Sequence, residues 1–466
     1  MSEKKKVTMD EIVSLCKRRG FIFPASEIYG GFANTFDYGP LGTALKNNIK
    51  SEWWKKFVTN RDDIVGLDSA IIQNPKIWKA SGHTEQFVDW MVECDKCNSR
   101  HRVEDILSEN EYSIKNDKCE ISSQTKEEQI CPSCKKVMDW EFFANPRSFN
   151  TMFKTFVGPT QEKDSVTYLR PETAQGIFTN FKNVIQSTRM KVPFGIAQIG
   201  KAFRNEITPG NFVFRTLEFE QAEIEYFVEN NNQASQKHFK DWTDKTKKFF
   251  TDLGVKDENL SIREHDKDEL SHYSIGTSDI EYEFPFGVSE LAGIAQRTDF
   301  DLKQHEKFSK EDLKYKEEGK EPYIPYVVEP SFGITRALLA FLVDAFDKSD
   351  GSDGRADGEV TLRLHKSLAP IKVAVFPLMK KEGLPEKAKE IVKTLKNQNI
   401  EIYYDESGSV GKRYRRQDEI GTPWCITVDF DSLEKGDVTV RDRDTMEQER
   451  VKISELPRYF QEKLKN

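Results

Sequence analysis

The chain has 466 residues, of which 37% are hydrophobic, and it carries a formal net charge of −8 at pH 7. This composition excludes an intrinsically disordered chain, and the negative charge argues against a protein that coats nucleic acid non-specifically. The N-terminal residues contain no apolar signal segment and no later stretch approaches about 18 uninterrupted apolar residues, so we expect a cytoplasmic protein.

Polar segments indicate how the chain is divided. Charged or glycine-containing stretches at residues 110–129, 307–321 and 348–358 interrupt the apolar pattern. An alternating segment at 371–376 then predicts a strand, and the helical stretch at 385–396 that follows it is typical of a small α/β domain. We predict a main domain over residues 1–93 and 140–368 with a polar insert near 307–321, an insertion over 94–139, and a C-terminal domain over 369–466.

The first strong helix signal in this main domain begins at Pro40. Four large apolar residues recur at every fourth position and form one stripe of a helix: Leu41, Leu45, Ile49 and Trp53. Two interpretations stay open, because such a stripe either faces the protein's own core or forms a dimer interface.

Two CxxC pairs lie in the predicted insertion, Cys94 with Cys97 and Cys131 with Cys134. This pattern favours a structural zinc site with four thiolates, although the gap between the pairs exceeds the usual spacing of a zinc ribbon. Four protein ligands leave no open position, so catalytic zinc is not expected. The histidines show no metal-binding pattern, and we predict structural roles for them, including His83, His101, His272 and His305.

The pattern of residues 203–227 predicts a long antiparallel hairpin, because two β-like runs flank a Pro-Gly-Asn turn signal at 209–211. Side chains alternate along a strand, so two arginines, an aromatic ring and two carboxylates would share one face. These groups suit the phosphates, the base and the exocyclic amine of a nucleotide. A solvated hairpin with surface ion pairs is the alternative. The five residues are Arg204, Glu206, Arg215, Phe219 and Glu223.

A strongly apolar helix is predicted after Gly333, with Arg336 in its first turn. A glycine lets a ligand approach the backbone, and a helix N-terminus favours an anion. An arginine at the positive end of the helix dipole is poorly placed unless a bound anion compensates it, which favours a functional role. The alternative is an arginine that extends from a buried helix to solvent.

In these motifs the chain resembles class II aminoacyl-tRNA synthetases, and among them most closely glycyl-tRNA synthetases of the homodimeric type. The three class II motifs appear in order, at residues 38–57, at 203–219 and at 333–336. The more specific matches, which extend the resemblance over nearly the whole chain, lie at residues 30–34, 170–176, 297–302 and 329–331. The resemblance implies an α+β fold, in which helices flank an antiparallel catalytic sheet and a C-terminal α/β anticodon-binding domain has a mixed sheet.

The resemblance also implies how ATP would bind. Arg204 would contact the α-phosphate and the substrate carboxylate, and Glu206 would read the adenine amine. Phe219 would stack on adenine opposite Arg336, and Arg215 would hold the γ-phosphate, so that Arg204 and Arg336 form the catalytic pair. The other residues implied at ATP are Asn205, Phe214, Thr216, Leu217, Glu218, Glu290, Leu291, Gly333, Ile334 and Thr335.

Glycine has no side chain to grasp, so a glycine site must recognise the ammonium group and exclude anything bulkier. The resemblance implies that Glu172, Glu223, Glu329 and Ser331 meet this ammonium group. The other residues implied in the substrate pocket are Arg102, Phe219, Glu220, Gln221, Ala222, Arg297, Pro330, Phe332 and Gly333.

The implied reaction has two steps: glycine attacks the α-phosphate of ATP and releases pyrophosphate, and the adenylate then passes glycine to the 3′-terminal ribose of tRNA-Gly. The implied cofactors are Mg²⁺ with ATP, for which Glu290 is a candidate ligand, and structural Zn²⁺. The implied partners are tRNA and a second copy of the chain that binds through the first motif, and no membrane is involved. The basic stretch at 411–416 is expected to contact the anticodon region, and a solvated loop is the alternative.

Two other functions compete with a glycine ligase. A non-catalytic synthetase-like protein that binds nucleic acid would be expected to lose charged groups of the ATP site, yet Arg204, Glu206, Arg215 and Arg336 are all present. A synthetase for serine, threonine or proline has no support from the stretches at 297–301 and 329–331.

Overall fold

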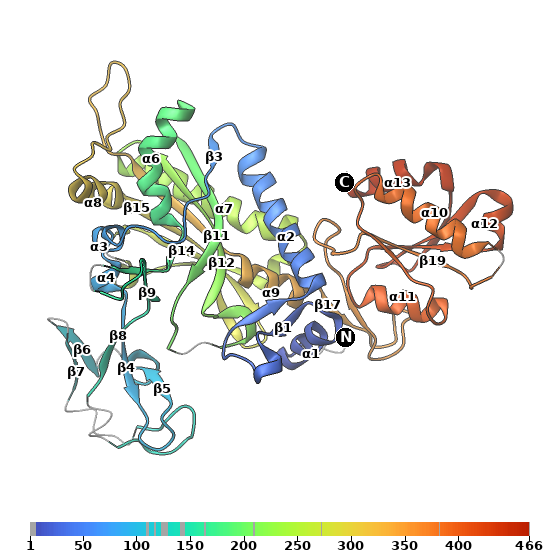
Figure 1. Cartoon of the computed structure of the whole chain (residues 1–466), viewed down its shortest axis with the longest axis horizontal. Coiled ribbons are helices and arrows are strands. Elements are labelled where there is room, and N and C mark those ends of the chain that lie inside the picture. Colours follow the sequence, from blue (N-terminus) through green and yellow to red (C-terminus); the bar gives the residue numbers. More distant parts are fainter. Residues whose placement is uncertain are drawn as a thin grey trace.

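The computed structural model describes residues 6–108, 111–115, 118–122, 129–139, 145–162, 165–207, 210–271, 273–381 and 383–465. The chain forms two units along its longest axis (Figure 1). We call residues up to β18 (Val360–Leu362) the main body, and residues from β19 (Val373–Pro377) onward the C-terminal unit. None of the described helices is long and apolar enough to cross a membrane.

A seven-stranded sheet forms the centre of the main body. Its strand order is β13-β14-β15-β16-β12-β11-β3, and neighbours are antiparallel except that β3 runs parallel to β11. Side chains alternate between the two faces along each strand. The strands are β3 (Ile64–Gly66), β11 (Phe194–Phe203), β12 (Glu218–Val228), β13 (Leu260–Glu264), β14 (Thr277–Phe284), β15 (Gly287–Thr298) and β16 (Tyr326–Gly333).

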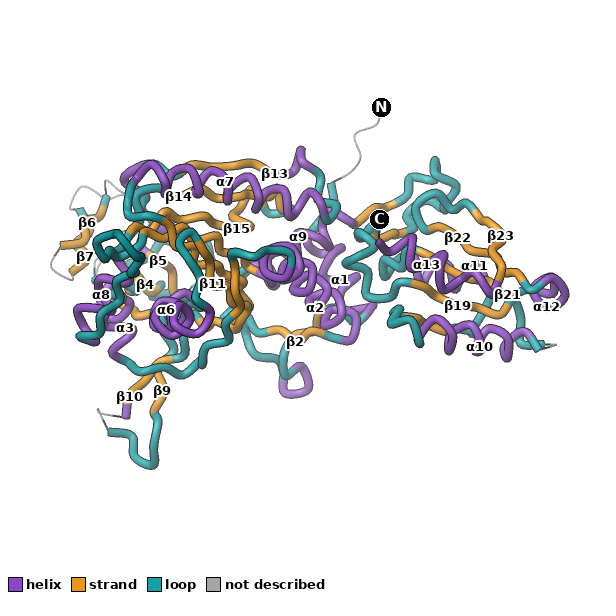
Figure 2. Tube along the Cα trace, turned by 90° about the horizontal axis from the view of Figure 1, so that it is seen from above, coloured by secondary structure: helices purple, strands orange, loops and turns teal. Residues whose placement is uncertain are grey.

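Helices cover both faces of this sheet, as the view from above shows (Figure 2). One face packs against α2 (Pro40–Trp54), α7 (Asn232–Asp252) and α9 (Ile334–Ala345), and these elements share one hydrophobic core. The other face packs in part against α6 (Ala174–Thr188) and α8 (Phe300–Ser309), which share a second core with it. Each fully buried aliphatic or aromatic side chain stabilises the fold by about 1.5–3 kcal/mol.

The helix predicted after Gly39 is α2. Leu45, Ile49 and Trp53 in its apolar stripe are fully buried, and Leu41 is half-buried. The Trp53 ring packs edge to face on Phe332 of β16, with ring centroids 5.8 Å apart. The core-facing interpretation of the stripe is therefore confirmed, and these side chains are not available to a second subunit.

The hairpin predicted over residues 203–227 is shorter than expected. β11 ends at Phe203 and β12 begins at Glu218, and the loop between them contains a single short turn of helix. The pairing of β11 with β12 stops because the backbone N–H of Asn205 donates to the carbonyl of Thr151, at 2.7 Å, and not to the returning strand.

Residues 204–207 and 210–217 therefore lie outside the strands, and the prediction that Arg204, Glu206 and Arg215 lie on a strand face is wrong. Asn211 and Phe212 have left-handed φ angles of 55° and 59°, which a continuing strand does not allow. Pro209 of the predicted turn lies outside the described residues.

Small sheets extend from one end of the main body (Figure 1). β4 (Val88–Glu93) pairs with β5 (Arg100–Arg102) and β8 (Arg147–Asn150), and β6 (Tyr112–Lys115) pairs with β7 (Lys118–Ile121). The remaining elements of the main body are α1 (Met9–Arg19), β1 (Ile22–Pro24), β2 (Phe36–Tyr38), α3 (Lys76–Ala80), α4 (His83–Gln86), β9 (Lys154–Phe156), β10 (Val166–Tyr168) and β17 (Phe346–Lys348).

The C-terminal unit is built on a five-stranded sheet in the order β20-β19-β21-β22-β23. The first three strands are parallel and the last two are antiparallel to their neighbours, so the sheet is mixed as predicted. Its own hydrophobic core contains Val375, Ile391, Ile426 and Phe460. The remaining elements are α10 (Leu384–Lys396), β20 (Ile402–Tyr404), α11 (Val410–Asp418), β21 (Trp424–Val428), α12 (Phe430–Lys435), β22 (Asp437–Asp442), β23 (Gln448–Lys452) and α13 (Leu456–Lys465).

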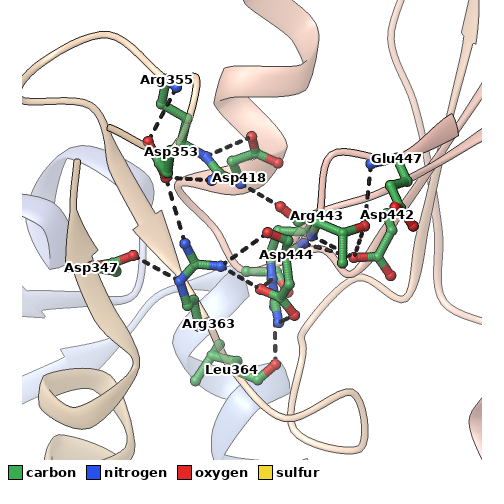
Figure 3. Close-up of polar contacts among 12 residues, drawn as sticks. Asp347, Asp353, Arg355, Arg363, Leu364, Asp418, Asp442, Arg443, Asp444 and Glu447 are labelled. Carbon is green, nitrogen blue, oxygen red and sulfur yellow. Dashed lines mark hydrogen bonds and ion pairs between the residues drawn. The ribbon is translucent and has the colours of Figure 1, made fainter. Parts of the chain in front are cut away.

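Ion pairs join the two units where β18 leads into the C-terminal unit (Figure 3). Arg363 at the end of β18 reaches Asp347 at 2.7 Å and Asp444 at 3.1 Å. Arg443 donates to the carbonyl of Leu364 at 2.9 Å, and Arg355 donates to the carbonyl of Arg443. Nearby, Arg355 pairs with Asp353 at 2.7 Å and Arg441 pairs with Asp418 at 2.9 Å. We call this set of contacts the junction network.

Candidate active site

The candidate site lies on the sheet face opposite α2 and α9. Register places Glu223 of β12 opposite Ser331 of β16, and Ser331 opposite Gly293 of β15. Because alternate residues of a strand share a face, further side chains lie on the same face. They are Phe219, Gln221 and Glu225 on β12, Glu329 on β16, and Arg297 on β15.

Neutral donors hold the carboxylate of Glu223. It accepts hydrogen bonds from the Thr173 backbone amide at 2.9 Å and from the Thr173 hydroxyl. The Gln221 side-chain amide donates at 3.0 Å, and the Ser331 hydroxyl donates at 2.9 Å. Four fixed donors leave this buried carboxylate little freedom to move.

Glu172, in the loop just before α6, lies in the same cluster. Its carboxylate accepts from the Gln175 side-chain amide at 3.0 Å and lies 3.3 Å from Nε2 of His83. The same Gln175 amide also donates to Asp301 at 3.0 Å, and its oxygen lies 2.8 Å from Nε2 of His305. This network fixes the loop before α6 against α8.

Arg297 of β15 crosses the cluster and is 1% exposed. Its guanidinium donates to both oxygens of Asp301 at 2.9 Å and forms an ion pair with Glu329. The guanidinium carbon also lies 4.0 Å from the centroid of the Tyr273 ring. Arg297 is thus fixed on both sides, and it holds the Glu329 carboxylate in place.

The cluster contains more acidic groups than basic ones. Among the described residues, the Arg297 guanidinium and the His83 imidazole contact three of five buried carboxyls. Neutral donors hold Glu223, and both oxygens of Glu225 have no hydrogen-bond partner. Such an excess favours binding of a cation, because an added positive charge stabilises ionised carboxylates. The five carboxyls are those of Glu172, Glu223, Glu225, Asp301 and Glu329.

Burial and mutual repulsion shift the pKa values of these carboxyls. Burial raises the pKa of Glu329 to about 8, although the Arg297 guanidinium opposes this shift. Burial and the neighbouring Glu172 also raise the pKa of Glu223. Burial acts in the same direction on Glu172, but His83 and Arg297 outweigh it and lower the Glu172 pKa. An ammonium ligand would restore the ionised form of Glu329.

Arg204 borders the carboxylate cluster at the start of the loop after β11. Its Nε donates to the carbonyl of Pro171, the residue before Glu172, at 3.1 Å. Its guanidinium carbon lies 5.2 Å from the Phe87 ring centroid and 5.5 Å from the Phe219 ring centroid. The Arg204 guanidinium therefore lies beside the acidic cluster and near Phe219, the residue implied to stack on adenine.

Arg336 lies in the first turn of α9, as predicted. Its Nη1 donates to the Glu290 carboxylate at 2.9 Å, and its Nε donates to the carbonyl of Phe214 at 3.3 Å. Its guanidinium carbon lies 4.5 Å from the Phe214 ring centroid, and it lowers the pKa of Glu290. The three implied ATP residues Arg336, Glu290 and Phe214 are therefore in mutual contact.

Glu290 has a second carboxylate close by. A Cβ atom added to Gly293 would lie 3.4 Å from Oδ1 of Asp279 and 3.6 Å from Oε1 of Glu290. Two carboxylates on adjacent strands fit Mg²⁺, which proteins bind through one or two carboxylates together with substrate phosphates. Asp279 was not among the predicted residues.

Arg102 extends from β5 to the loop after β11. Its guanidinium lies 3.1 Å from the Glu206 carboxylate, 3.0 Å from Asp89 and 2.9 Å from Glu104. These contacts connect Arg102 to a residue implied at ATP and not to the acidic cluster. Its place in the substrate pocket stays a prediction.

Several residues implied at the site have side chains that face elsewhere. Glu220 lies on the opposite face of β12 from Glu223, where it pairs with Lys46 at 2.7 Å and Lys50 at 3.0 Å on α2. Apolar residues at alternate positions pack into the core behind the sheet. These are Ala222, Leu291, Phe332 and Ile334, and Pro330 and Thr335 are also buried.

Other residues implied at ATP lie in the loop after β11. Several of their hydrogen bonds are made within that loop and to the start of β12. The Arg204 amide donates to the Leu217 carbonyl at 3.0 Å, and the Thr216 hydroxyl donates to the Glu218 carbonyl at 2.8 Å. Arg215 exchanges two backbone hydrogen bonds with Gly210, each of 3.2 Å. The loop is therefore ordered by its own backbone.

The prediction did not include the following residues of this site: His83, Phe87, Thr173, Gln175, Glu225, Asp279 and Asp301. Three of them lie in stretches that carried the resemblance, since Thr173 and Gln175 fall in 170–176 and Asp301 follows Arg297 by four residues. His83 and Phe87 come from a distant segment with no motif, so only the fold brings them here. His272 lies outside the described residues.

The two CxxC pairs come together. The Sγ atoms of Cys94 and Cys134 are 3.8 Å apart, as are those of Cys97 and Cys131, and all four lie within 4.8 Å of one another. Tetrahedral zinc with Zn–S bonds of about 2.3 Å places its sulfurs about 3.8 Å apart, so the four thiols fit this metal.

The basic stretch at 411–416 forms most of α11, and its central residues serve the fold. Arg413 is 2% exposed and donates to the carbonyl of Pro377, and the Tyr414 hydroxyl bonds to Thr427 at 2.6 Å. Tyr414 is therefore not free to stack on an unpaired base. Lys412 and Arg415 are exposed.

The fold and this site define a class II aminoacyl-tRNA synthetase. The model of the "tRNA synthetase class II core domain (G, H, P, S and T)" matches residues 153–345, and that of the "Anticodon binding domain" matches residues 372–463. A solved prolyl-tRNA synthetase from Cryptosporidium parvum, complexed with halofuginone and AMPPNP, has the same fold. It aligns with a TM-score of 0.65 at 15% identity, over 98% of this chain and 77% of that one.

Curated relatives identify the family more closely. The glycine–tRNA ligase of Alkaliphilus oremlandii is 54% identical, over 98% of this chain and 99% of its own length. That of Clostridium acetobutylicum is 54% identical over 99% of this chain and 100% of its own length. The chain belongs to the glycine–tRNA ligase family. The predicted family, enzyme class and α+β fold are confirmed, and the non-catalytic alternative finds no support.

Proposed function

We propose that this chain activates glycine with ATP to form glycyl-adenylate and pyrophosphate, and then transfers glycine to the 3′-terminal ribose of tRNA-Gly. One observation carries this proposal: Arg204 adjoins the acidic cluster through the Pro171 carbonyl, next to Glu172. An amino acid fits between these groups, because its ammonium would meet the carboxylates while its own carboxylate meets the guanidinium.

The first step needs no general base, because the attacking carboxylate is already an anion. Arg204 would hold this carboxylate near the α-phosphate, and Arg336 would meet the nucleotide after releasing Glu290. Positioning and charge stabilisation of this kind supply most of the acceleration in comparable sites. Mg²⁺ bound by Glu290 and Asp279 would neutralise phosphate charge. Phe219 would stack on the base and Glu206 would accept from its amine, while Arg215 would hold the γ-phosphate.

Selectivity for glycine would come from a rigid, acidic pocket. Glu172, Glu223 and Glu329 would surround the ammonium group together with Ser331. Since four donors already fix Glu223, its carboxylate cannot withdraw to admit a methyl group. Overpacking of this kind costs about 1–3 kcal/mol or more, which disfavours alanine.

Further parts of the proposal follow from the family and the fold. Residues 1–93 and 140–368 would form the catalytic domain, 94–139 a zinc-binding insertion, and 369–466 the domain that contacts the anticodon. The insertion would hold one structural Zn²⁺ through its four cysteines. We also place the enzyme in the cytoplasm, where its tRNA substrate occurs.

A homodimer is part of the same proposal, with a different contact surface from the one first considered. The α2 stripe is buried, but three large apolar residues between β1 and β2 are exposed: Ile28 by 89%, Tyr29 by 87% and Phe32 by 63%. Such a patch favours association with a second copy. Tyr29→Lys should convert dimer to monomer in sedimentation equilibrium, whereas Val288→Lys at another exposed site should not. A dimer that survives Tyr29→Lys would refute this surface.

The decisive assay for the function is amino-acid-dependent exchange of pyrophosphate into ATP. Glycine should support exchange, while alanine and serine should support little. Absence of exchange with every amino acid would refute the proposed enzyme activity. Exchange with serine but not with glycine would refute only the specificity.

A further inference from the structure

A cavity of about 430 Å³ lies between the main body and the C-terminal unit. Its walls come from α1, from the segment that leads into β18, and from α11, which meet at the junction of the two units (Figure 1). Six of its lining side chains are cations: Arg18, Arg19, Arg355, Lys412, Arg415 and Arg416. The cavity is separate from the acidic cluster and from the loop after β11.

The acidic groups in the cavity wall do not balance these cations. Glu419 pairs with both Arg18, at 2.8 Å, and Arg19. Glu359 pairs with Arg415 at 2.6 Å.

The third acid, Asp418, is held at 2.9 Å and 3.0 Å by Arg441, which does not line the cavity. Two more of the cations pair with acids outside the wall, Arg355 with Asp353 at 2.7 Å and Arg416 with Asp405 at 2.8 Å. No described acidic group pairs with the Lys412 ammonium, and Glu419 is shared between two arginines. Positive charge is therefore in excess around the cavity.

The cations also crowd one another. Burial lowers the pKa of Arg19, and the nearby guanidinium groups of Arg18 and Arg416 lower it further. Like charges brought together in a partly buried space are unfavourable unless an anion lies between them. Guanidinium and ammonium groups match the oxygens of a phosphate, which they bind through charge-assisted hydrogen bonds.

The chemistry of the wall points to a phosphate and not to a base. The aromatic residue of α11 does not line the cavity, since the Tyr414 hydroxyl bonds to Thr427 and its ring packs on Phe376. Without an available ring, an unpaired base has no surface on which to stack. Contacts to phosphates fix the position of a nucleic acid and carry no sequence information.

We propose that this cavity binds a backbone phosphate of the tRNA as it passes from the catalytic domain to the C-terminal unit. The inference rests on the proposed function, because that substrate must contact both units. The rim is open to a large ligand, since the side chains of Arg18 and Arg415 are 52% and 62% exposed. The cavity would thus fix the register of the tRNA without reading its bases.

The test is a pair of matched double variants of the full-length enzyme. Lys412→Gln with Arg415→Gln removes two cavity cations, and Lys435→Gln with Arg458→Gln removes two exposed cations elsewhere in the C-terminal unit. The cavity variant should raise the KM for tRNA about five- to tenfold, and should reduce the slope of log binding constant against log salt by about 1. The control should change neither.

Three further results decide the interpretation. Glycine-dependent pyrophosphate exchange, which needs no tRNA, should be unchanged in the cavity variant, and Arg18→Gln should raise the KM for tRNA in the same way from the opposite wall. The loss should be equal for tRNAs with altered anticodon bases, because a phosphate contact is blind to sequence.

An equal loss in both double variants would overturn the proposal, as would a loss confined to certain anticodons. Inorganic phosphate or pyrophosphate that raises the Tm of the wild type but not of the cavity variant, with the KM for tRNA unchanged, would instead assign the cavity to a small anion. A wild-type enzyme without exchange activity would refute the proposed function, and tRNA binding against salt would still test the cavity.

Discussion

The acidic cluster and the junction network are two groups of charged side chains that differ in their balance of acidic and basic groups. In the cluster, one guanidinium and one imidazole pair with three of the five buried carboxyls described. In the junction network, four arginines contact four aspartates and several carbonyls. The aspartates are Asp347, Asp353, Asp418 and Asp444, and the arginines are Arg355, Arg363, Arg441 and Arg443.

The difference in balance separates a binding site from a structural contact. A buried network whose charges cancel is complete without a ligand, and removing one member leaves an uncompensated charge. A buried network with excess acid is incomplete and gains from an added cation. We therefore expect substitutions in the junction network to reduce stability, and substitutions in the cluster to reduce glycine binding.

The largest expected effect is on stability, at Asp418 in the junction network. Asp418→Asn removes the charge that faces Arg441 at 2.9 Å and 3.0 Å, and both side chains are nearly buried. Breaking a buried pair costs about 3–5 kcal/mol. Urea unfolding measures this loss.

The matched control for Asp418 is Asp431→Asn, which breaks an exposed pair with Lys435. An exposed pair of this kind contributes at most about 1 kcal/mol. Equal stability of the two variants would show that this buried pair contributes no more to stability than an exposed one.

The second effect is on glycine binding, at Glu329. Glu329→Gln removes a carboxylate that would meet the ammonium group, and a hydrogen bond to a charged group contributes about 1.5–3 kcal/mol. The KM for glycine should rise between about tenfold and a hundredfold, while the KM for ATP changes little. The free energy of unfolding should not fall, because an amide oxygen can still accept from Arg297.

Glu264→Gln, at an exposed position on β13 of the same sheet, is the control for Glu329→Gln and should change neither constant. Equal losses for glycine and ATP in Glu329→Gln would indicate that this carboxylate only supports the fold of the site.

The third effect is a pH dependence of kcat/KM for glycine. Burial raises the pKa of Glu329 to about 8, so this carboxyl is largely protonated in the free enzyme below that pH. Glycine would bind the ionised form and release a proton, and kcat/KM for glycine should therefore rise by up to about tenfold per pH unit until pH reaches about 8. Exchange assays from about pH 6.5 to about pH 8.5 measure the profile.

Glu329→Gln should remove this rise, because its side chain does not titrate. The ATP constant should stay flat over the same range in both proteins. A wild-type profile that is already flat would show that the cluster is ionised without glycine.

The part of the site that the sequence could predict is the part carried by contiguous motifs. The strand period places Phe219 and Glu223 on one face, and Arg336 begins its helix as expected. The positions of Arg204 and Glu206 could not be derived in this way, because a hydrogen bond from Asn205 to the distant Thr151 ends the strand. Local periodicity does not report such a contact.

Two further limits have the same physical origin. The α2 stripe fitted a core or a dimer equally well, and the ring of Phe332 on a strand far along the chain decided between them. Similarly, the basic stretch at 411–416 has uniform composition, yet Arg413 is buried and donates to the carbonyls of Pro377, at the end of β19, and of Leu378. Burial is set by partners distant in sequence.

The smallest expected effect on activity comes from removing one of the four clustered cysteines, Cys94, Cys97, Cys131 and Cys134. These thiols resemble the acidic cluster, because both are sets of donor groups that a cation would stabilise. Wild-type protein should contain about one zinc per chain by mass spectrometry, and Cys97→Ser should lose it. Exchange activity should fall by less than about threefold, because the four thiols leave no open position for a substrate.

The loss should appear in the KM for ATP and not for glycine, since Arg102 of β5, in the same insertion, reaches Glu206 at 3.1 Å. Cys119→Ala, in the same insertion but outside the cluster, should keep the zinc. Complete loss of exchange in Cys97→Ser with the fold intact would give the metal a direct part in the reaction. Wild-type protein without zinc would instead show that a set of donors in excess does not by itself define a cation site, which would also weaken the argument for the acidic cluster.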